Sequence, residues 1–528
     1  MKKIHFAILV CTLALTTACF KDLDQRPDTS SETDAGTVYS TLDGYRSMLA
    51  KIYGSYVLTG LEKGGGNADL TSNNGQDLMR CYFNLQEAAT DEIAYTWLSG
   101  DKMTDLVSMN WDENDPWVGD TYYRLYYTIT LCNEFLRHRS EAASLTGTEQ
   151  NEVNSYMAEA RFVRALAWWM VLDLYNQGAF VDENTPMGAY TPEARNAGEL
   201  FQYIESELKA ISDGTDGLKD RAGYGRACKA AGWFLLARLY LNAEVYGAGD
   251  HYEDCVTYCK KVRGAGYTLE EDYGKLFNAD NDKRSDEIIF AFVTDATHTV
   301  TWGGATYVVC GQCDHENIIG VEKYGIDVGW GSFRVHGELP DLFDPVDITQ
   351  STDTRCRFYS AGRTKNLDKG IDDPSNGYFA MKWSNLKDDG TPSSTTSENG
   401  VDTDWPLMRL ADVYLMEAEA VLRGATGTSA DDAMGLVNEV RERAQASPVV
   451  ASNFSLDFIL KERAREFYLE AQRRTDLRRF GCFTTSAYLW QWKGGVLDGR
   501  AVDAKYEYYP IPAAEISANA NLKNLNYR

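Results

Sequence analysis

Histidine is scarce in this sequence. The 528 residues include six histidines, and these form no recognisable catalytic triad or metal-binding set. No motif marks a pair of catalytic carboxylates, although 78 acidic residues leave many pairs available to a glycoside hydrolase. We therefore expect a protein that is not an enzyme, and a glycoside hydrolase stays as the alternative from that class.

Long hydrophobic runs are also lacking. Beyond residues 1–18 the chain has no run of about 18 apolar residues, so nothing else is expected to span a membrane. Two lysines followed by the apolar residues 4–15 are typical of a secretory signal. Small residues then lead into Cys19 in a pattern that resembles a bacterial lipobox. We expect residues 1–18 to be a lipoprotein signal peptide and Cys19 to be the lipid anchor; the alternative is an ordinary signal with an incidental cysteine.

Basic residues are outnumbered by acids. The chain has 52 lysines and arginines against 78 acids, which gives a net charge of −26. A surface this acidic repels nucleic acid and anionic lipid at long range, so it favours a neutral or cationic ligand. Aromatic residues, by contrast, make up 12% of the chain. Tyrosine and tryptophan in such numbers suit a surface that recognises flat apolar faces.

The cysteines cannot form a complete disulfide framework. Nine of the eleven lie beyond Cys19, and an odd number leaves at least one thiol unpaired. Cys310 and Cys313 have the CxxC spacing of half a zinc site, with His315 close by, but no second pair lies within reach. We expect buried or idle thiols there rather than zinc.

Helical periodicity dominates the rest of the chain. Apolar residues recur at i, i+3, i+4 and i+7 in four segments, at 162–169, 233–240, 407–422 and 460–471. Each segment has a second expected helix near it, at 122–139, 196–211, 252–263 or 430–446. Paired helices of this kind bury one another's apolar faces, as in helical-repeat proteins. We expect a mostly α-helical fold built from such pairs.

Two loop-rich insertions interrupt the helical pattern, at about 60–119 and 281–404. The second is rich in glycine, aspartate, serine and threonine, which is typical of loops. Short β-type runs occur within it, at 287–293 and 305–310. Binding residues favour loops positioned by a rigid scaffold, so ligand-binding side chains are expected in these insertions.

Five sequence blocks, in a fixed order, carry a family resemblance. They are AEARFVRALAWWMVLDLY (158–175), GRACKAAGWFLLARLYLNAEVY (225–246), WPLMRLADVYLMEAEA (405–420), KERAREFYLEAQRRTDLRRFG (461–481) and YYPIPAAEISANANLKNLNY (508–527). Together they resemble the RagB/SusD family of outer-membrane glycan-binding lipoproteins. The segments at 302–311 and 464–495 are most similar to the starch-binding members of that family.

This resemblance implies a fold, a location and a partner. It implies a mostly α protein in which tetratricopeptide-like helix pairs form a right-handed scaffold with an irregular, loop-rich sub-domain. Residues 19–528 would form one glycan-binding domain, lipid-anchored on the outer membrane at the cell surface of a Bacteroidetes cell. The domain would bind a polysaccharide such as starch or another α-glucan. It would deliver this ligand to a SusC-like TonB-dependent transporter.

The resemblance also implies the residues that bind the glycan. Sugar rings present apolar C–H faces on which aromatic rings stack, and their hydroxyls bond to polar side chains. By resemblance, the glycan-binding residues are Trp97, Tyr95, Trp302, Trp330 and Arg80. Gly100 stands where the starch-binding members have an asparagine, which removes one contact. The alternatives are that these rings lie in the core, that Arg80 is an ordinary surface arginine, or that the ligand is another neutral glycan. A helical-repeat adaptor for peptides is the remaining alternative from a different class.

Calcium is the one metal that the sequence suggests. Asp280 and Asp282 alternate in NADNDKRSDE and offer the hard oxygen ligands that calcium prefers. The family resemblance implies a structural calcium at Asp282, with Asp404 completing the site. The alternative is a solvated acidic loop.

Overall fold

The computed structural model describes residues 35–62, 67–70, 76–188, 190–215, 217–345, 347–394 and 400–524. The predicted signal peptide at 1–18 and the predicted lipid anchor Cys19 therefore lie outside the described residues. In the part that is described, no helix is both long and apolar enough to cross a membrane.

Helices dominate the described chain, which confirms the mostly α prediction. The longer helices are α3 (Leu42–Gly54), α4 (Leu78–Glu87), α6 (Pro116–Arg137), α7 (Gly147–Tyr175), α8 (Ala197–Ser212), α9 (Lys229–Leu241), α10 (Tyr252–Arg263), α11 (Gly304–Gln312), α12 (Leu410–Leu422), α13 (Ala430–Arg443), α14 (Leu456–Phe467) and α15 (Arg473–Arg479). The shorter ones are α2 (Ala35–Val38), α5 (Thr104–Val107) and α16 (Ala513–Ala518).

The strands are short and pair two by two. The antiparallel pairs are β1 (Ile93–Tyr95) with β5 (Phe333–Val335), β2 (Gln177–Ala179) with β3 (Ala194–Asn196), β4 (Ile288–Phe292) with β8 (Trp405–Arg409), and β6 (Phe358–Tyr359) with β7 (Phe379–Ala380). Three of these four pairs involve the segment 281–404 or its borders. Strand β4 confirms the β-type run expected at 287–293.

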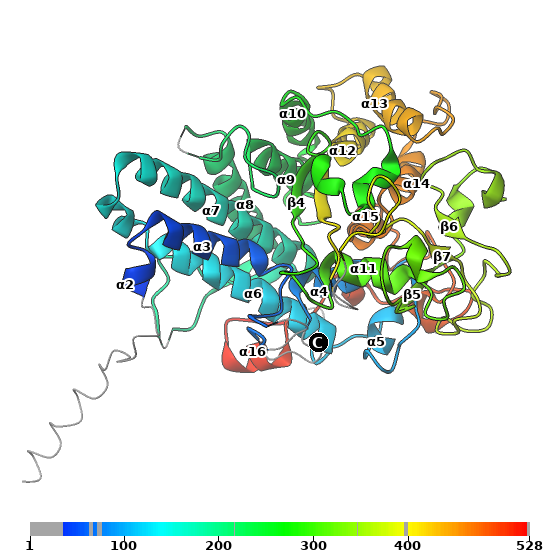
Figure 1. Ribbon diagram of the computed structural model, residues 1–528, viewed down its shortest axis with the longest axis horizontal. Helices are drawn as coiled ribbons and strands as arrows, with labels where there is room; N and C mark the ends of the chain where they lie inside the picture. Colours follow the sequence, from blue (N-terminus) through cyan, green and yellow to red (C-terminus); the bar gives the residue numbers. More distant parts are fainter. Residues whose placement is uncertain are drawn as a thin grey trace, which may run out of the picture.

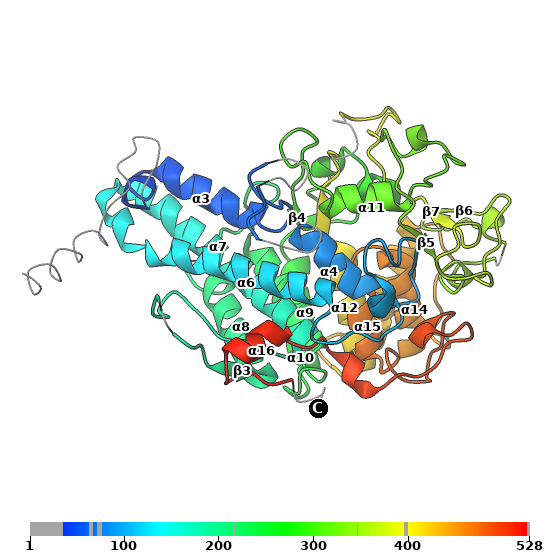
Figure 2. The same ribbon diagram turned by 90° about the horizontal axis from the view of Figure 1, so that it is seen from below.

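From α6 to α13, with α11 left out, the helices pack against one another in chain order. Helix α6 contacts α7, α7 contacts α8, α8 contacts α9, α9 contacts α10, α10 contacts α12, and α12 contacts α13. Figures 1 and 2 show α3, α6 and α7 toward one end of the molecule, with α8, α9, α10 and α12 following toward its middle. Helix α11 and strands β5, β6 and β7 lie toward the opposite end, where loops predominate. The predicted helix pairs and the loop-rich part beside them are both present.

Helix α7 illustrates why these residues form long helices. Thr146 and Glu149 make a reciprocal capping box at its start, and Asn176 ends it with a left-handed φ of 60°. Trp168 and Trp169 are buried, as the apolar stripe predicts. We expect their indole rings to contribute to the core and to take no part in ligand binding.

Two short apolar runs adopt the opposite structure from the one predicted. The sequence predicts that a helix begins at Leu407, but residues 407–409 belong to strand β8; it predicts a strand at 305–310, but these residues lie in helix α11. Both runs are buried along their whole length. A continuously apolar segment gives no periodicity that separates strand from helix, so these two predictions were wrong. Helix α4 lies inside the expected loop-rich segment 60–119 and is buried at every residue, although it contains polar and charged side chains.

The stripe through Ala471 also differs, because helix α14 ends earlier. Leu469 and Ala471 both have a φ of 61°, in the left-handed region that ends helices. The Leu469 N–H donates to Glu92 Oε2 at 2.8 Å, and the Gln472 N–H donates to Glu87 Oε1 at 3.0 Å. Glu87 is the last residue of α4 and Glu92 comes directly before β1, so the two acids flank the segment that joins these elements. The C-terminal helices therefore hold that segment in place.

Candidate functional site

Three tryptophans gather where the loop-rich segments meet. Trp97 follows strand β1, Trp330 precedes strand β5, and pairing of these strands brings the two residues together. The Trp97 Nε1–H donates to the Trp330 carbonyl at 3.2 Å. Trp302 lies just before helix α11. We call Trp97, Trp302 and Trp330 the aromatic arc.

The arc residues differ in how much of each side chain reaches solvent. Trp97 is 44% exposed and Trp302 is 40% exposed, which is unusual for so large an apolar residue. Trp330 is half-buried and packs partly against the core. Two broad rings are therefore available for stacking, with the third beside them.

Arg80 connects Trp302 to the turn that carries Trp97, on the buried side of the arc. Its Nη1 donates to the Trp302 carbonyl at 2.9 Å, and its Nη2 pairs with Asp101 Oδ2 at 3.2 Å. Asp101 closes the turn that carries Trp97, because its N–H donates to the Trp97 carbonyl at 3.0 Å. Arg80 is only 6% exposed, and its guanidinium lies 4.2 Å from the centre of the Tyr307 ring. Its first role is thus to position the arc, and a direct bond to sugar stays a prediction.

Tyr95 is not part of the exposed surface, which corrects its predicted stacking role. The residue is completely buried at the end of strand β1. Its hydroxyl donates to Asp101 Oδ2 at 2.5 Å. The chain leaves the strand before Trp97, so the two rings do not share one face as they would in a longer strand. Tyr95 supports the Trp97 turn from the interior.

Asp77 is a positioning residue that the sequence did not reveal. Its carboxylate caps helix α4 by accepting from the Arg80 N–H at 2.9 Å. It also accepts from the Thr301 hydroxyl at 3.0 Å and from the Gly304 N–H at 3.2 Å. A Cβ at Gly303 would lie 2.1 Å from this carboxylate, so only glycine fits there. Burial raises the pKa of Asp77, although these hydrogen bonds oppose the rise.

The CxxC pair also serves the arc. The Cys310 carbonyl accepts from the Trp330 N–H at 2.8 Å, and the Cys313 carbonyl accepts from the Gly331 N–H at 2.8 Å. Both side chains are buried at the end of α11, and burial raises the pKa of each thiol. Over the described ranges, no cluster of three or more His, Cys, Asp or Glu residues could hold a metal ion. The backbone of the pair fixes the Trp330 loop on α11.

The two expected calcium ligands lie near each other but differ in burial. Asp282 is exposed, whereas Asp404 is 1% exposed. Burial raises the pKa of Asp404 to about 7, the Thr294 N–H lowers it, and the charge of Asp282 adds to the rise. Such unbalanced negative charge fits a divalent cation, which would need carbonyl or water oxygens to complete its shell. The calcium stays a prediction.

Chelation tests the calcium prediction. At pH 7.5 we expect EDTA to lower the melting temperature, because a bound ion stabilises the folded state by about 2.7 kcal/mol at 100 times its dissociation constant. Asp282→Ala and Asp404→Asn should abolish the response. The measurement is a thermal melt with and without EDTA, then with added calcium. A wild-type melting curve indifferent to EDTA would remove calcium from the description.

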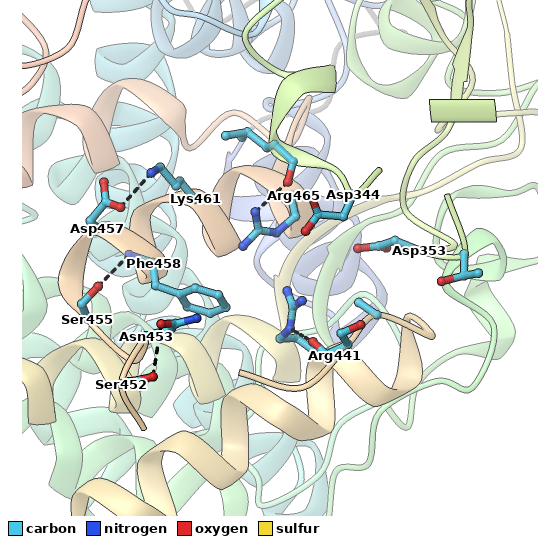
Figure 3. A pocket seen from close by; sticks show the side chains of 14 residues that line it. Asp344, Asp353, Arg441, Ser452, Asn453, Ser455, Asp457, Phe458, Lys461 and Arg465 are labelled. Atoms are coloured by element: carbon cyan, nitrogen blue, oxygen red, sulfur yellow. Dashed lines mark hydrogen bonds and ion pairs between the residues drawn. The ribbon is translucent and has the colours of Figure 1, made fainter. Parts of the chain in front are cut away.

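A separate hollow lies between helices α13 and α14, away from the arc. Its volume is about 460 Å³, and Figure 3 shows the side chains that line it. Lys461 pairs there with Asp457 at 2.7 Å. Arg441 and Arg465 lie 5.3 and 5.4 Å from the centre of the Phe458 ring, and both pair with a buried glutamate. Its cations are already neutralised and its single ring is half-covered, so the aromatic arc is the better candidate for a ligand with broad apolar faces.

The chain is similar to known glycan-binding proteins. The SusD family matches residues 271–528. The starch-binding protein SusD of Bacteroides thetaiotaomicron is 34% identical, over 100% of this chain and 99% of that protein. Two solved structures share the fold. A SusD-like protein from Bacteroides fragilis is 21% identical with a TM-score of 0.69, covering 93% of this chain and 98% of that one. Surface glycan-binding protein A from Bacteroides thetaiotaomicron, in complex with laminarihexaose, is 19% identical with a TM-score of 0.69, covering 92% of this chain and 99% of that one.

Proposed function

This chain belongs to the SusD family, and on that premise we propose that it captures starch or another α-glucan at the cell surface. The aromatic arc binds the polysaccharide, and the protein passes it to a SusC-like TonB-dependent transporter in the outer membrane. The protein performs no catalysis. Another neutral glycan in the same role is the alternative ligand.

The observation that carries this proposal is the pair of exposed indoles held by a rigid frame. Trp97 and Trp302 each keep two-fifths or more of their surface in solvent, although they are among the largest apolar side chains. The buried Arg80 and Asp77 fix the backbone on either side of them. Stacking against sugar C–H faces gives an exposed ring of this kind a function. A peptide adaptor would instead be expected to present a groove lined by helices.

The choice of α-glucan rests on two further points. A relative that aligns over the full length is a starch-binding protein. The net charge of −26 disfavours polyanionic glycans. Gly100 offers no side chain to a sugar hydroxyl, and a structural neighbour was solved with laminarihexaose, so other neutral glycans belong in the test.

Affinity electrophoresis against a set of polysaccharides tests the proposal. We expect amylopectin and pullulan to retard the purified protein, laminarin and dextran to retard it less, and the polyanion alginate to have no effect. No release of reducing ends from amylopectin is expected, and such release would favour the glycoside hydrolase. Mobility unchanged by every neutral polysaccharide would refute the proposed function.

The anchor is tested in cells. If Cys19 carries the lipid, Cys19→Ala should release the protein from the membrane and abolish surface labelling of whole cells by antibody. Cys11→Ala provides a matched control, because Cys11 lies inside the predicted signal peptide. Surface labelling of the Cys19 variant at the wild-type level would contradict the lipobox interpretation.

A further inference from the structure

His315 lies at the junction of two rings of the arc. Its imidazole meets the Trp97 indole edge to face, with ring centres 5.8 Å apart and an angle of 73° between the planes. Its backbone lies directly against Gly331, the residue after Trp330. A Cβ at Gly331 would be 2.8 Å from the His315 Cβ and 2.9 Å from its nitrogen. The close approach fixes where the imidazole stands relative to both tryptophans.

The imidazole of His315 is exposed, and its two ring nitrogens are available for hydrogen bonds. The side chain reaches solvent, and among the described residues neither ring nitrogen makes a hydrogen bond or an ion pair. The other polar groups near Trp97 are already engaged. Arg80 and Tyr95 both bond to Asp101, and the Trp97 Nε1–H is used by the Trp330 carbonyl. Stacking rings alone hold a sugar without fixing its rotation, so a polar partner beside Trp97 matters for orientation.

We propose that His315 hydrogen-bonds the hydroxyl groups of the sugar ring that stacks on Trp97, and so orients the glycan on the arc. This inference rests on the proposed glycan-binding function. A neutral imidazole offers one donor and one acceptor on a rigid ring, which suits two adjacent hydroxyl groups. His315 thereby supplies the kind of contact that Gly100 lacks. The sequence marked His315 only as a neighbour of the CxxC pair, because its contact with Trp97 comes from the folding of two distant loops.

Three variants separate hydrogen bonding from packing. His315→Ala removes both, His315→Phe keeps a ring against Trp97 without polar atoms, and His315→Asn keeps a donor and an acceptor. With maltoheptaose as the probe in isothermal titration at pH 7.5, we expect about fivefold or greater weakening for the Ala and Phe variants, as for the loss of one or two hydrogen bonds. The Asn variant should recover much of the wild-type affinity. His298→Ala is the matched control, because His298 is exposed but bonds to Asp295.

The outcomes distinguish this inference from the proposed function. Thermal melts of all four variants should match the wild type, since both histidines are exposed. If Trp97→Ala weakens binding while the Ala and Phe variants bind like wild type, the arc stands and the role of His315 is refuted. An Asn variant as weak as the Ala variant also refutes it, because hydrogen bonding would then not be the reason. A wild-type protein that binds neither maltoheptaose nor any neutral polysaccharide overturns both proposals.

Discussion

Replacing Trp97, Trp302 and Trp330 together by alanine should abolish binding of α-glucan and leave the fold intact. Each stacked ring contributes about 1 kcal/mol beyond the area that it buries, so three rings provide most of the affinity of a shallow surface. The two most exposed rings contribute little to the core. Single replacements should each weaken binding severalfold, and the triple variant should show no measurable heat on titration.

Isothermal titration with maltoheptaose and a thermal melt of each variant make the measurement. Trp169→Ala is the control, because its indole is 2% exposed inside helix α7. That change should cost about 3–5 kcal/mol of stability and leave the affinity of the folded fraction unchanged. The arc would be wrongly assigned if the triple variant bound like wild type. It would be equally wrong if the triple variant melted as far below wild type as Trp169→Ala does.

Most of the long helices and strand β4 could be predicted from the sequence, whereas strand β8 and helix α11 could not. Helix α7 has both a clear stripe and a capping box, so its periodicity and its start agree. Strand β8 and helix α11 are surrounded by protein, and their sequences are apolar at nearly every position. In such buried segments, the element that packs beside the segment decides whether it forms a helix or a strand. Strand β8 has β4 to pair with, and this pairing joins segments more than 100 residues apart.

The three tryptophans of the candidate site could be predicted from the sequence, whereas the residues that hold them in place could not. Trp97, Trp302 and Trp330 come from family resemblance, and the structure brings them together. Asp77 has only the signature of a helix cap, while its second partner, Thr301, lies 224 residues further along the chain. An exposed Tyr95 is expected only if strand β1 continues through Trp97, because residues two apart then share one face. The supporting roles of these residues depend on contacts between distant loops, which local sequence patterns do not reveal.

A buried ionic cluster connects the sheet of β4 and β8 to helix α14. Arg409, at the end of β8, donates to Glu287 at 2.9 Å, to Glu466 at 3.0 Å and to Glu470 at 2.8 Å. All four side chains are almost completely buried. Burial alone would raise the pKa of Glu466, but the guanidinium groups of Arg443, Arg409 and Arg355 hold it well below its usual range. This cluster also fixes the loop whose Leu469 N–H binds the segment leading to Trp97.

Arg409→Met should therefore destabilise the protein by about 3–5 kcal/mol, because Glu287, Glu466 and Glu470 each lose one of the buried cations with which they pair. A carboxyl group whose pKa is lowered by folding stabilises the folded state above its unfolded pKa of about 4.3, and this contribution disappears as the pH falls. Loss of Arg409 raises the pKa of Glu466, so a fall in pH protonates this buried carboxylate in the variant before it does so in the wild type. The difference in free energy of unfolding between wild type and variant should consequently be smaller at pH 5 than at pH 8.

Urea unfolding at both pH values measures this difference. The control is Arg46→Met, which breaks an exposed pair with Asp43 and should change neither unfolding curve. Equal destabilisation at the two pH values would mean that Arg409 acts through packing and not through its charge.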